Sequence, residues 1–490
     1  MTIDPRTPVV VGVGQVVQRC APAEAVETVA LMTQAVETAV ADAGAPGLGA
    51  TATAVRVVNG AWRYPDPGRI VAERVGAPEA TTGLSTDGGN TPQYLVNLSC
   101  LDLLAGRHET VVLVGCETIY TRRRARAAGL RIPTTIQEGV EPDEVLGADV
   151  TMSSEHETAR GLEMPINFYP LFESAIRASR GESVDEHRDR IAQLWEGFNR
   201  VAVANPYAWR RDPMTWQQIR EATDDNRMVG FPYTKAMNSN WDLDQAAAVI
   251  LTTAETAERL GVARDRWVFP LVGTDAMDTA NVTHRQDLHS SPAIRHAGAR
   301  AFELASVGPD DLAHVDLYSC FPSAVQIGAT ELGLGQDRQL TVTGGLTFAG
   351  GPLNNYVMHS IATMVDLLRE DAGSTGLCTA NGGYVTKHAI GLYSTTPPEA
   401  GFRHDDVQPI VDAEPTTPAA EDHVGPGTIE AYTVMHGRDG AEVGLVAVAT
   451  PDGRRAWGNT RDGALMVEMC TTEHIGSAVE LDPDGVVHPA

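Results

Sequence analysis

The sequence predicts an α/β fold made of two related halves, followed by a small antiparallel β domain. Residues 25–43 place apolar side chains at three- and four-residue spacing, as in a helix packed on a sheet, and a strand pattern follows at 54–58. The same order of helix and strand returns at 293–317. Apolar runs typical of buried strands stand at comparable places in the two halves, at 110–115 and 376–379. This internal similarity indicates a duplicated α/β unit.

The first predicted strand, residues 8–14, ends in the glycine pair Gly12 and Gly14. A dinucleotide-binding turn would carry a third glycine where Val17 stands, so we interpret the pair as a tight turn. Residues 123–234 are more polar and contain proline and aromatic clusters. We expect them to form a mostly helical insertion that covers one face of the core.

The chain changes character after Tyr393. Prolines and acids without periodicity predict an extended linker. Beyond it, alternating apolar and polar residues separated by Asp-Gly pairs predict short strands of a separate antiparallel β-barrel. The expected boundaries are 1–122 with 235–262 for the N-terminal half, 123–234 for the insertion, 263–397 for the C-terminal half, 398–427 for the linker and 428–490 for the barrel.

The net charge of the chain is −27, and such an acidic surface disfavours binding to nucleic acids. A basic stretch stands out against this background. It contains Arg122, Arg123, Arg124 and Arg126, with Arg131 close behind. Two interpretations stay open: a local site for a phosphate-bearing ligand, or a solvated basic turn paired with nearby acids.

Several features exclude other classes of protein. No apolar run approaches the roughly 18 residues that cross a bilayer, and the N-terminus lacks a basic stretch followed by an apolar one. We therefore expect a cytoplasmic protein. The six cysteines are scattered without a C-x-x-C pair, and the histidines do not cluster, so we predict neither a disulfide framework nor a metal site.

Five segments together resemble the sterol carrier protein-2-type branch of the thiolase superfamily. They are residues 88–118, 232–262, 315–326 (VDLYSCFPSAVQ), 344–360 (GGLTFAGGPLNNYVMHS) and 377–383 (LCTANGG). The likeness covers roughly residues 5–395 in order and spacing. The tail resembles the additional C-terminal barrel of the thiolase-like protein type 1 group. The resemblance implies a five-layer αβαβα fold with a helical loop domain, and an acyl-CoA ligand of lipid or sterol metabolism with no further cofactor. It leaves open whether the protein is a homodimer or a monomer.

The nucleophile of a thiolase is the first departure from this pattern. A thiolase places a cysteine at the N-terminus of a buried helix, where the dipole favours the thiolate. The matching position here is Gly89, which has no side chain to acylate. Thr91 follows as the expected N-cap, with Pro92 in the first turn. As a substitute nucleophile, Thr91 would lack an adjacent base.

Two further departures affect the remaining catalytic positions. Gly351 stands where the family has its catalytic histidine, and Tyr318 stands where an asparagine or histidine helps to form the oxyanion hole. Loss of one oxyanion donor typically costs roughly 10²–10³ in rate. Classical thiolysis or Claisen condensation is therefore not expected. The resemblance implies that the substrate is bound by Thr91, Gly350, Gly351, Asn354, Tyr356, Arg122, Arg123 and Arg124.

Three residues are the candidates for any surviving chemistry. Cys378 matches the cysteine that thiolases use as a general acid and base, Cys320 could face the same pocket, and Tyr318 offers a phenol. The alternative for both cysteines is packing as small buried side chains. His388, alone in an apolar stretch, is interpreted as a core histidine.

Three functions agree with these residues. The first is a degenerate thiolase that binds acyl-CoA and uses non-covalent chemistry, such as retro-aldol cleavage of a β-hydroxyacyl-CoA, with Tyr318 and Cys378 as carriers. The resemblance supplies this version, since thiolase-like aldolases lack the nucleophile and depend on a small barrel-containing partner, to which the C-terminal barrel here would correspond. The second is a residual acyltransferase that uses Cys320 or Cys378. The third is a binding or scaffolding protein without turnover.

Overall fold

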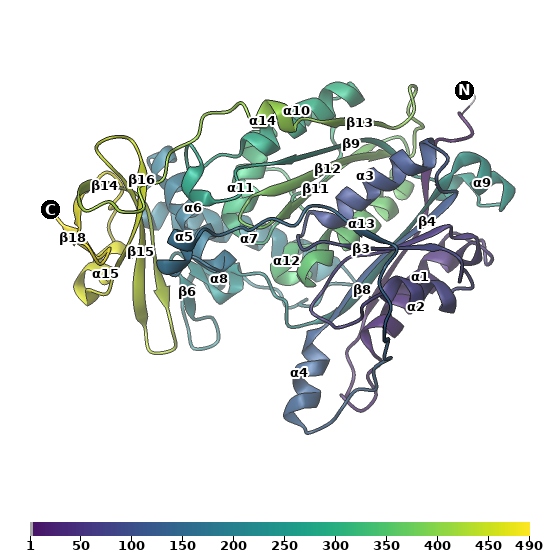
Figure 1. The fold of residues 1–490 in the computed structure, drawn as a ribbon, viewed down its shortest axis with the longest axis horizontal. Helices are drawn as coiled ribbons and strands as arrows, with labels where there is room; N and C mark the ends of the chain where they lie inside the picture. The colour runs from purple at the N-terminus through teal and green to yellow at the C-terminus, as the bar shows by residue number, and fades with distance from the viewer. Residues whose placement is uncertain (1–2) are drawn as a thin grey trace.

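The computed structural model describes residues 3–490 and stacks two mixed sheets on either side of a layer of helices (Figure 1). The first sheet has the strand order β1-β8-β4-β2-β3-β5. Its central strands β2, β4 and β8 are buried along their whole length because both faces of the sheet are covered. The bounds are β1 (Pro8–Val17), β2 (Ala54–Val57), β3 (Thr81–Ser85), β4 (Thr110–Thr118), β5 (Glu144–Leu146) and β8 (Asp244–Thr253).

The second sheet has the order β10-β11-β12-β9-β13. Strands β11 and β12 form an antiparallel pair, and β10 lies parallel to β11, so that Asp316 is opposite Cys378. The bounds are β9 (Phe269–Met277), β10 (His314–Asp316), β11 (Thr375–Gly382), β12 (Lys387–Ser394) and β13 (Arg403–Asp406).

Helices complete the five layers. Helices α3 (Thr91–Leu104) and α13 (Tyr356–Glu370) lie between the sheets and contact strands of both. Buried residues occur all round α3, as expected for a helix enclosed by protein. The outer faces are covered by α1 (Thr28–Asp42) and α2 (Pro67–Arg74) on the first sheet and by α10 (Pro292–Ala305) on the second, with α11 (Pro322–Glu331) packed beside α10. The predicted duplicated α/β fold is confirmed.

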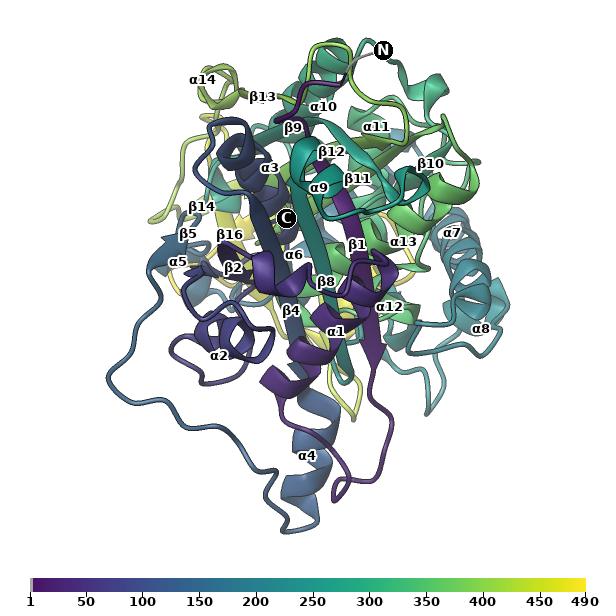
Figure 2. The same ribbon diagram turned by 90° about the vertical axis from the view of Figure 1, so that its right-hand side faces the viewer.

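The insertion between the halves is mostly helical. Helix α4 projects from the body of the molecule, and an extended segment leads from it back to β5 (Figure 2). The other helices of the insertion pack beside α11 and the C-terminal domain. The bounds are α4 (Ile119–Ala127), α5 (Glu155–Ala159), α6 (Pro165–Arg180), α7 (Val184–Ala204), α8 (Trp216–Arg220), β6 (Met228–Gly230) and β7 (Tyr233–Thr234). The core also holds the short helices α9 (Ala254–Arg259) and α12 (Gly345–Phe348).

A third, antiparallel sheet forms the C-terminal domain, with the order β16-β15-β14-β17-β18 and β6 of the insertion paired to β14. A single bridge, Asn459 to Val486, links β16 to the turn before β18, so closure into a barrel stays a prediction. The segment 398–427, expected to be a linker, also adds β13 to the second sheet. The bounds are α14 (Gln408–Val411), β14 (Gly425–His436), β15 (Ala441–Ala449), β16 (Arg455–Thr460), α15 (Gly463–Met469), β17 (Ala478–Leu481) and β18 (Val487–Pro489).

Residues 3–490 contain no helix long and apolar enough to cross a membrane and no group of three or more potential metal ligands. All six cysteines are free, and Cys100, Cys116, Cys320 and Cys378 are buried. Thiols in such surroundings usually pack as small apolar side chains.

Candidate active site

The turn before α3 brings Gly89 to the head of the inner helix. Gly88 has a φ of +148°, a conformation that favours glycine, and its carbonyl accepts hydrogen bonds from both the amide and the hydroxyl of Thr91. The expectation that Thr91 is the N-cap is therefore wrong: the helix begins at Thr91, and its hydroxyl donates to the turn instead of accepting from a backbone amide. Asn90 stands at the cap position without a side-chain cap.

Tyr318 fills the space beside Gly89. A Cβ atom at Gly89 would lie 2.6 Å from the Cζ atom of Tyr318, closer still to its hydroxyl oxygen, and 2.5 Å from the carbonyl oxygen of Asn381. Ordinary contacts between such atoms are about 3.5–4.0 Å long. The phenol thus occupies the place where a side chain at position 89 would project. Residue 89 must be glycine as long as Tyr318 keeps this position.

The Tyr318 hydroxyl is held as a proton donor. Burial, reinforced by the nearby Cys320, raises the pKa of Tyr318 well above its usual value, so the phenol stays protonated at neutral pH. The edge of its ring packs against Tyr356, with ring centroids 5.7 Å apart. Within residues 3–490 the structure gives the hydroxyl no hydrogen-bond partner. Beside Tyr318 and Asn381 lies a space of about 20 Å³, which is about the size of one water or one carbonyl oxygen.

The part of β11 beside Gly89 is the backbone carbonyl of Asn381, not Cys378. The two residues are three positions apart on β11, so they point to opposite faces of the strand and lie about 10 Å apart along it. Cys378 is fully buried, and Ser360 of α13 donates a hydrogen bond to its sulfur over 3.6 Å. Burial raises the pKa of Cys378 far above the range in which a thiol exchanges protons at neutral pH. The structure thus favours the packing interpretation of Cys378, which sequence reasoning left open.

Cys320 lies closer to the site than Cys378. The side-chain amide of Asn381 points at its sulfur from 4.0 Å and also donates to the hydroxyl of Tyr169 over 2.9 Å. Burial raises the pKa of Cys320 to about 12, so its thiol is protonated at neutral pH and a poor nucleophile. The Oδ1 atom of Asn381 is buried without a partner among the described residues. It is an acceptor that a ligand could satisfy.

The residues in and after the Gly350-Gly351-Pro352 turn make packing and hydrogen-bond contacts within the protein. A Cβ at Gly351 would meet Leu346 at 3.2 Å, so the apolar side chain of Leu346 fills the space beside Gly351. Gly350 has a φ of +119° and packs on Gln245. Asn354 accepts a hydrogen bond from the amide of Gly88 over 3.1 Å and so fixes the turn before α3.

Tyr356 is turned away from the ligand side. Its hydroxyl donates to the Asp316 carboxylate over 2.9 Å and contacts Thr343 over 2.6 Å. All three side chains are buried. Two of the residues expected to bind the substrate therefore have structural contacts instead. Asn354 positions the turn before α3, and the ring of Tyr356 packs against the ring of Tyr318. His388 is buried 3.4 Å from the Asp278 carboxylate, as a core histidine.

Lys387 is a candidate that sequence reasoning missed. It is one of two lysines in the chain, and unlike the exposed Lys235 it is buried, with its amine 3.0 Å from the place of a Cβ at Gly88. The amine donates to the carbonyls of Asp87 and Ala148. Burial lowers the pKa of Lys387, against the opposing effect of two nearby acids. The sequence offered only one signal for Lys387: lysine is rare in this chain, and this one follows directly after a turn.

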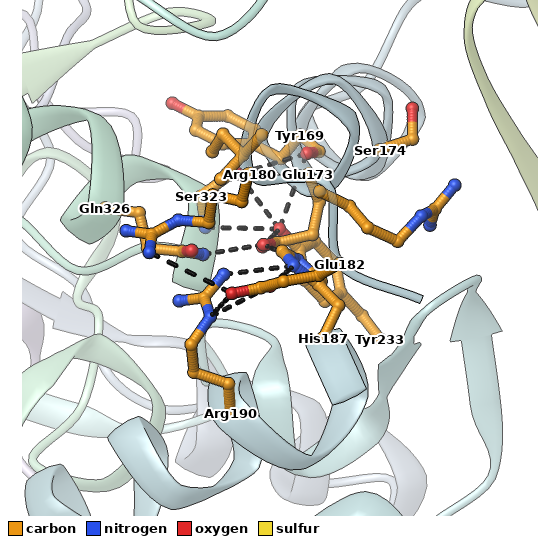
Figure 3. Close-up of polar contacts among 12 residues, drawn as sticks. Tyr169, Glu173, Ser174, Arg180, Glu182, His187, Arg190, Tyr233, Ser323 and Gln326 are labelled. Atoms are coloured by element: carbon orange, nitrogen blue, oxygen red, sulfur yellow. Dashed lines mark hydrogen bonds and ion pairs between the residues drawn. The ribbon is translucent and has the colours of Figure 1, made fainter. Parts of the chain in front are cut away.

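A buried charged network supports the far side of the site (Figure 3). Glu173 of α6 faces the Nε2 atom of His187 of α7 over 2.5 Å and accepts from Gln326 of α11 over 2.6 Å. Glu182 faces the other ring nitrogen of His187 over 2.7 Å. Arg190 also points a guanidinium N–H at the Nδ1 atom of His187 from 3.0 Å. Tyr233 donates to Glu173 as well. Because Gln326 and Ser323, which bond to Glu173 and Tyr233, belong to the second half, this network joins the insertion to it.

The arginines of α4 divide between two faces of the helix. Arg122 and Arg126, one helical turn apart, line a hollow beside the start of α2. Arg123 instead forms an ion pair with Asp242 at the surface, and the guanidinium of Arg124 stacks on the ring of Tyr120. The three arginines expected to bind the substrate together, Arg122 to Arg124, therefore do not converge.

The two stacked halves, with the glycine turn at the head of the inner helix, define a protein of the thiolase fold. Solved thiolase-fold structures match at low identity: the Ltp2-ChsH2(DUF35) aldolase shares 17% identity with a TM-score of 0.59, over 80% of this chain and 98% of that chain. Human mitochondrial 3-ketoacyl-CoA thiolase also shares 17%, with a TM-score of 0.59, over 80% of this chain and 100% of that chain.

The particular family is shown by a much more similar structure. The monomeric SCP2-thiolase-like protein type 1 of Mycobacterium smegmatis shares 31% identity over the full length of both chains, with a TM-score of 0.85. The profile of the thiolase-like protein type 1 additional C-terminal domain matches residues 406–486. The chain belongs to the SCP2-thiolase-like protein type 1 family.

A curated relative is more distant. The acetyl-CoA acetyltransferase of Methanothermobacter thermautotrophicus is 27% identical over 203 residues, which are 38% of this chain and 51% of that protein. The chain thus matches about half the length of this relative.

Proposed function

We propose that the protein binds an acyl-CoA ester at the head of α3 without forming a covalent acyl-enzyme. The observation that carries this proposal is the contact between Gly89 and Tyr318. Not only is the thiol missing, but the phenol occupies the space that a nucleophile would need. The cysteines nearby are buried and protonated at neutral pH, which disfavours an acyltransferase that recruits Cys320 or Cys378.

Tyr318 suits a reaction that needs a fixed proton donor at a carbonyl oxygen. Its hydroxyl has no partner in the described chain, and the backbone amides at the start of α3 point toward the same end of the helix. An enolate oxygen formed from a thioester would accept hydrogen bonds from such donors. This is the electrostatic stabilisation that carbon–carbon bond cleavage beside a thioester requires.

We therefore favour retro-aldol cleavage of a β-hydroxyacyl-CoA as the chemistry of this site. Lys387 removes the proton of the β-hydroxyl group, and the β-carbon–oxygen bond becomes a carbonyl as the bond between the α- and β-carbons breaks. The electron pair of that bond passes to the thioester as an enolate, which Tyr318 stabilises. Protonation of the α-carbon by the Lys387 ammonium yields a shorter acyl-CoA and a ketone or aldehyde. The buried amine, with its lowered pKa, suits the role of the base.

The test incubates the purified chain with a panel of β-hydroxyacyl-CoA esters of lipid and steroid side chains and measures carbonyl product and shortened acyl-CoA. Tyr318→Phe should lower kcat by about 10²–10³, because one donor to the enolate is lost. Tyr120→Phe, which removes the hydroxyl of a half-buried tyrosine of α4, is the matched control and should leave the rate unchanged. Lys387→Met should lower kcat by about 10²–10⁴ and remove the acidic limb of the pH profile, where protonation of the base limits the rate.

Intact-mass measurement after incubation with acyl-CoA separates the alternatives. An acyl adduct on Cys320 or Cys378 would show the acyltransferase and overturn the non-covalent proposal. Acyl-CoA binding without any cleavage would refute the retro-aldol step and leave a binding or scaffolding protein. Absence of acyl-CoA binding would overturn the proposal as a whole.

A further inference from the structure

A hollow of about 610 Å³ opens between α4, the start of α1 and the segment that precedes α2. Figure 2 shows α4 and the extended segment after it projecting together from the body of the molecule. None of the residues that surround Gly89 lines this hollow. Its volume lies in the range of ordinary small-molecule sites, roughly 300–1,000 Å³.

Four arginines line the hollow, in a chain whose net charge is −27. Arg122 is already engaged, because it donates to the carbonyl of Ala61 and lies 3.5 Å from the Glu117 carboxylate. The side chains of the other three, Arg63, Arg126 and Arg131, have no ion-pair or hydrogen-bond partner in the part of the chain that the structure describes. These three exposed side chains line one hollow, where like charges repel one another, so an anion bound between them would be stabilising.

The one acid of the hollow does not cancel this charge. Glu27 is bound by Arg74 over 2.9 Å and accepts further hydrogen bonds from Thr135 and Tyr64. Burial alone would raise the pKa of Glu27, but these hydrogen bonds outweigh it and lower the pKa, so the carboxylate is ionised and already paired. The positive charge of the three other arginines is left for a ligand.

The hollow also offers an aromatic surface. Trp62 and Tyr64 both line it, with ring centroids 5.8 Å apart. The indole of Trp62 is fixed because its Nε1 atom donates to the carbonyl of Cys116 over 3.1 Å. A rigid aromatic ring beside a group of arginines is the combination that binds a nucleobase together with its phosphates, since bases stack on aromatic faces and guanidinium groups pair with phosphate oxygens.

We propose that this hollow binds a phosphate-bearing nucleotide, with Arg63, Arg126 and Arg131 on the phosphates and Trp62 beside the base. Two sources share this chemistry: a free nucleotide and the nucleotide end of coenzyme A. The nucleotide end of coenzyme A agrees with the position of the hollow, because one short segment links the hollow to the candidate active site. Ala61 lines the hollow, and two residues earlier the side chain of Asn59 donates to Asp87, near Gly89, over 3.0 Å. Only this second source rests on the function proposed above.

The experiment is isothermal titration of the full chain with 3′,5′-ADP, ATP and coenzyme A at low salt. None of these ligands carries an acyl group, so their binding does not depend on chemistry at Gly89. The double variant Arg63→Ala/Arg126→Ala should weaken binding by about 100-fold, since each charged hydrogen bond contributes about tenfold or more. The matched control is Arg123→Ala/Arg124→Ala, which removes the same charge from two arginines that do not line the hollow and should change affinity less than threefold.

The ligands also distinguish the two sources. Tighter binding of 3′,5′-ADP and coenzyme A than of ATP would identify the nucleotide end of coenzyme A, and equal or tighter binding of ATP would identify a free nucleotide. Both results support the site. No measurable binding of any of the three, or an equal loss in both double variants, would overturn it. Far-ultraviolet circular dichroism and thermal unfolding confirm that each variant is folded.

Discussion

Substitution of Gly89 by alanine tests whether Tyr318 truly fills the nucleophile's place. The added methyl group would lie 2.6 Å from the Tyr318 Cζ atom and 2.5 Å from the Asn381 carbonyl oxygen, so both neighbours would have to move by about 1 Å to restore normal contacts. Overpacking of this kind typically costs about 1–3 kcal/mol. We expect the upper end of that range, because the Asn381 oxygen belongs to the backbone of β11 and cannot rotate away.

A second glycine provides the control. Gly197 lies inside α7, and a Cβ there would meet no atom within 4 Å. Gly197→Ala should stabilise the protein by about 0.5–1 kcal/mol, because alanine is the better helix former. The two substitutions add the same methyl group, so the difference between them isolates the collision at Gly89.

Urea denaturation followed by circular dichroism measures these changes in the free energy of unfolding. They are read from the transition in which the thiolase-fold core unfolds. A double-mutant cycle with Tyr318→Ala identifies the partner. Removal of the phenol should reduce the cost of Gly89→Ala by about 1–2 kcal/mol, while the clash with the Asn381 carbonyl remains. If Gly89→Ala were as harmless as Gly197→Ala, or cost the same with and without Tyr318, the phenol would not occupy the vacant position.

Two further substitutions test the buried charges that hold the domains together. The pKa of Glu173 is lowered from 4.5: burial raises it, but hydrogen bonds and the charge of His187 outweigh burial, so the stabilisation is complete above pH 4.5 and is lost as the pH falls through the folded pKa. Glu173→Gln should cost about 3–5 kcal/mol at pH 7 and flatten the loss of stability below pH 4.5, and an unchanged pH dependence in urea titrations would contradict this account. Arg455 is 1% exposed and binds the Glu430 carboxylate over 2.7 Å and the Thr283 carbonyl over 2.9 Å. Arg455→Met should loosen the C-terminal domain and speed limited proteolysis within 398–427, whereas Arg454→Met at the half-exposed neighbouring position should not.

Much of the architecture could be predicted from the sequence because it depends on local patterns. Hydrophobic periodicity is repeated in both halves, and α1 and α10 lie where the pattern placed helices, each followed by a strand of its sheet. The linker was predicted less well. Residues 403–406 are polar and exposed or half-buried, without the alternation of a strand, yet they pair with β9 at the edge of the second sheet.

The candidate site was predicted in part. Gly89 and Tyr318 were identified as departures from the thiolase pattern, but sequence spacing could not show that one fills the space of the other. Cys378 seemed the natural partner of the vacant position, because cysteine is the expected residue type. The structure places the backbone carbonyl of Asn381 there, and Cys378 lies three residues earlier on β11, about 10 Å away along the strand.

The sequence by itself determined that no thiol stands at the head of α3, because the identity of residue 89 requires no coordinates. It also determined the order of the elements, through the period of the apolar residues. Only the tertiary structure decided which group replaces the thiol, how the arginines of α4 divide, and that Lys387, Glu173 and His187 are buried. Contacts between distant segments depend on how helices and strands pack, and burial, which controls the pKa of each group, exists only once they have packed.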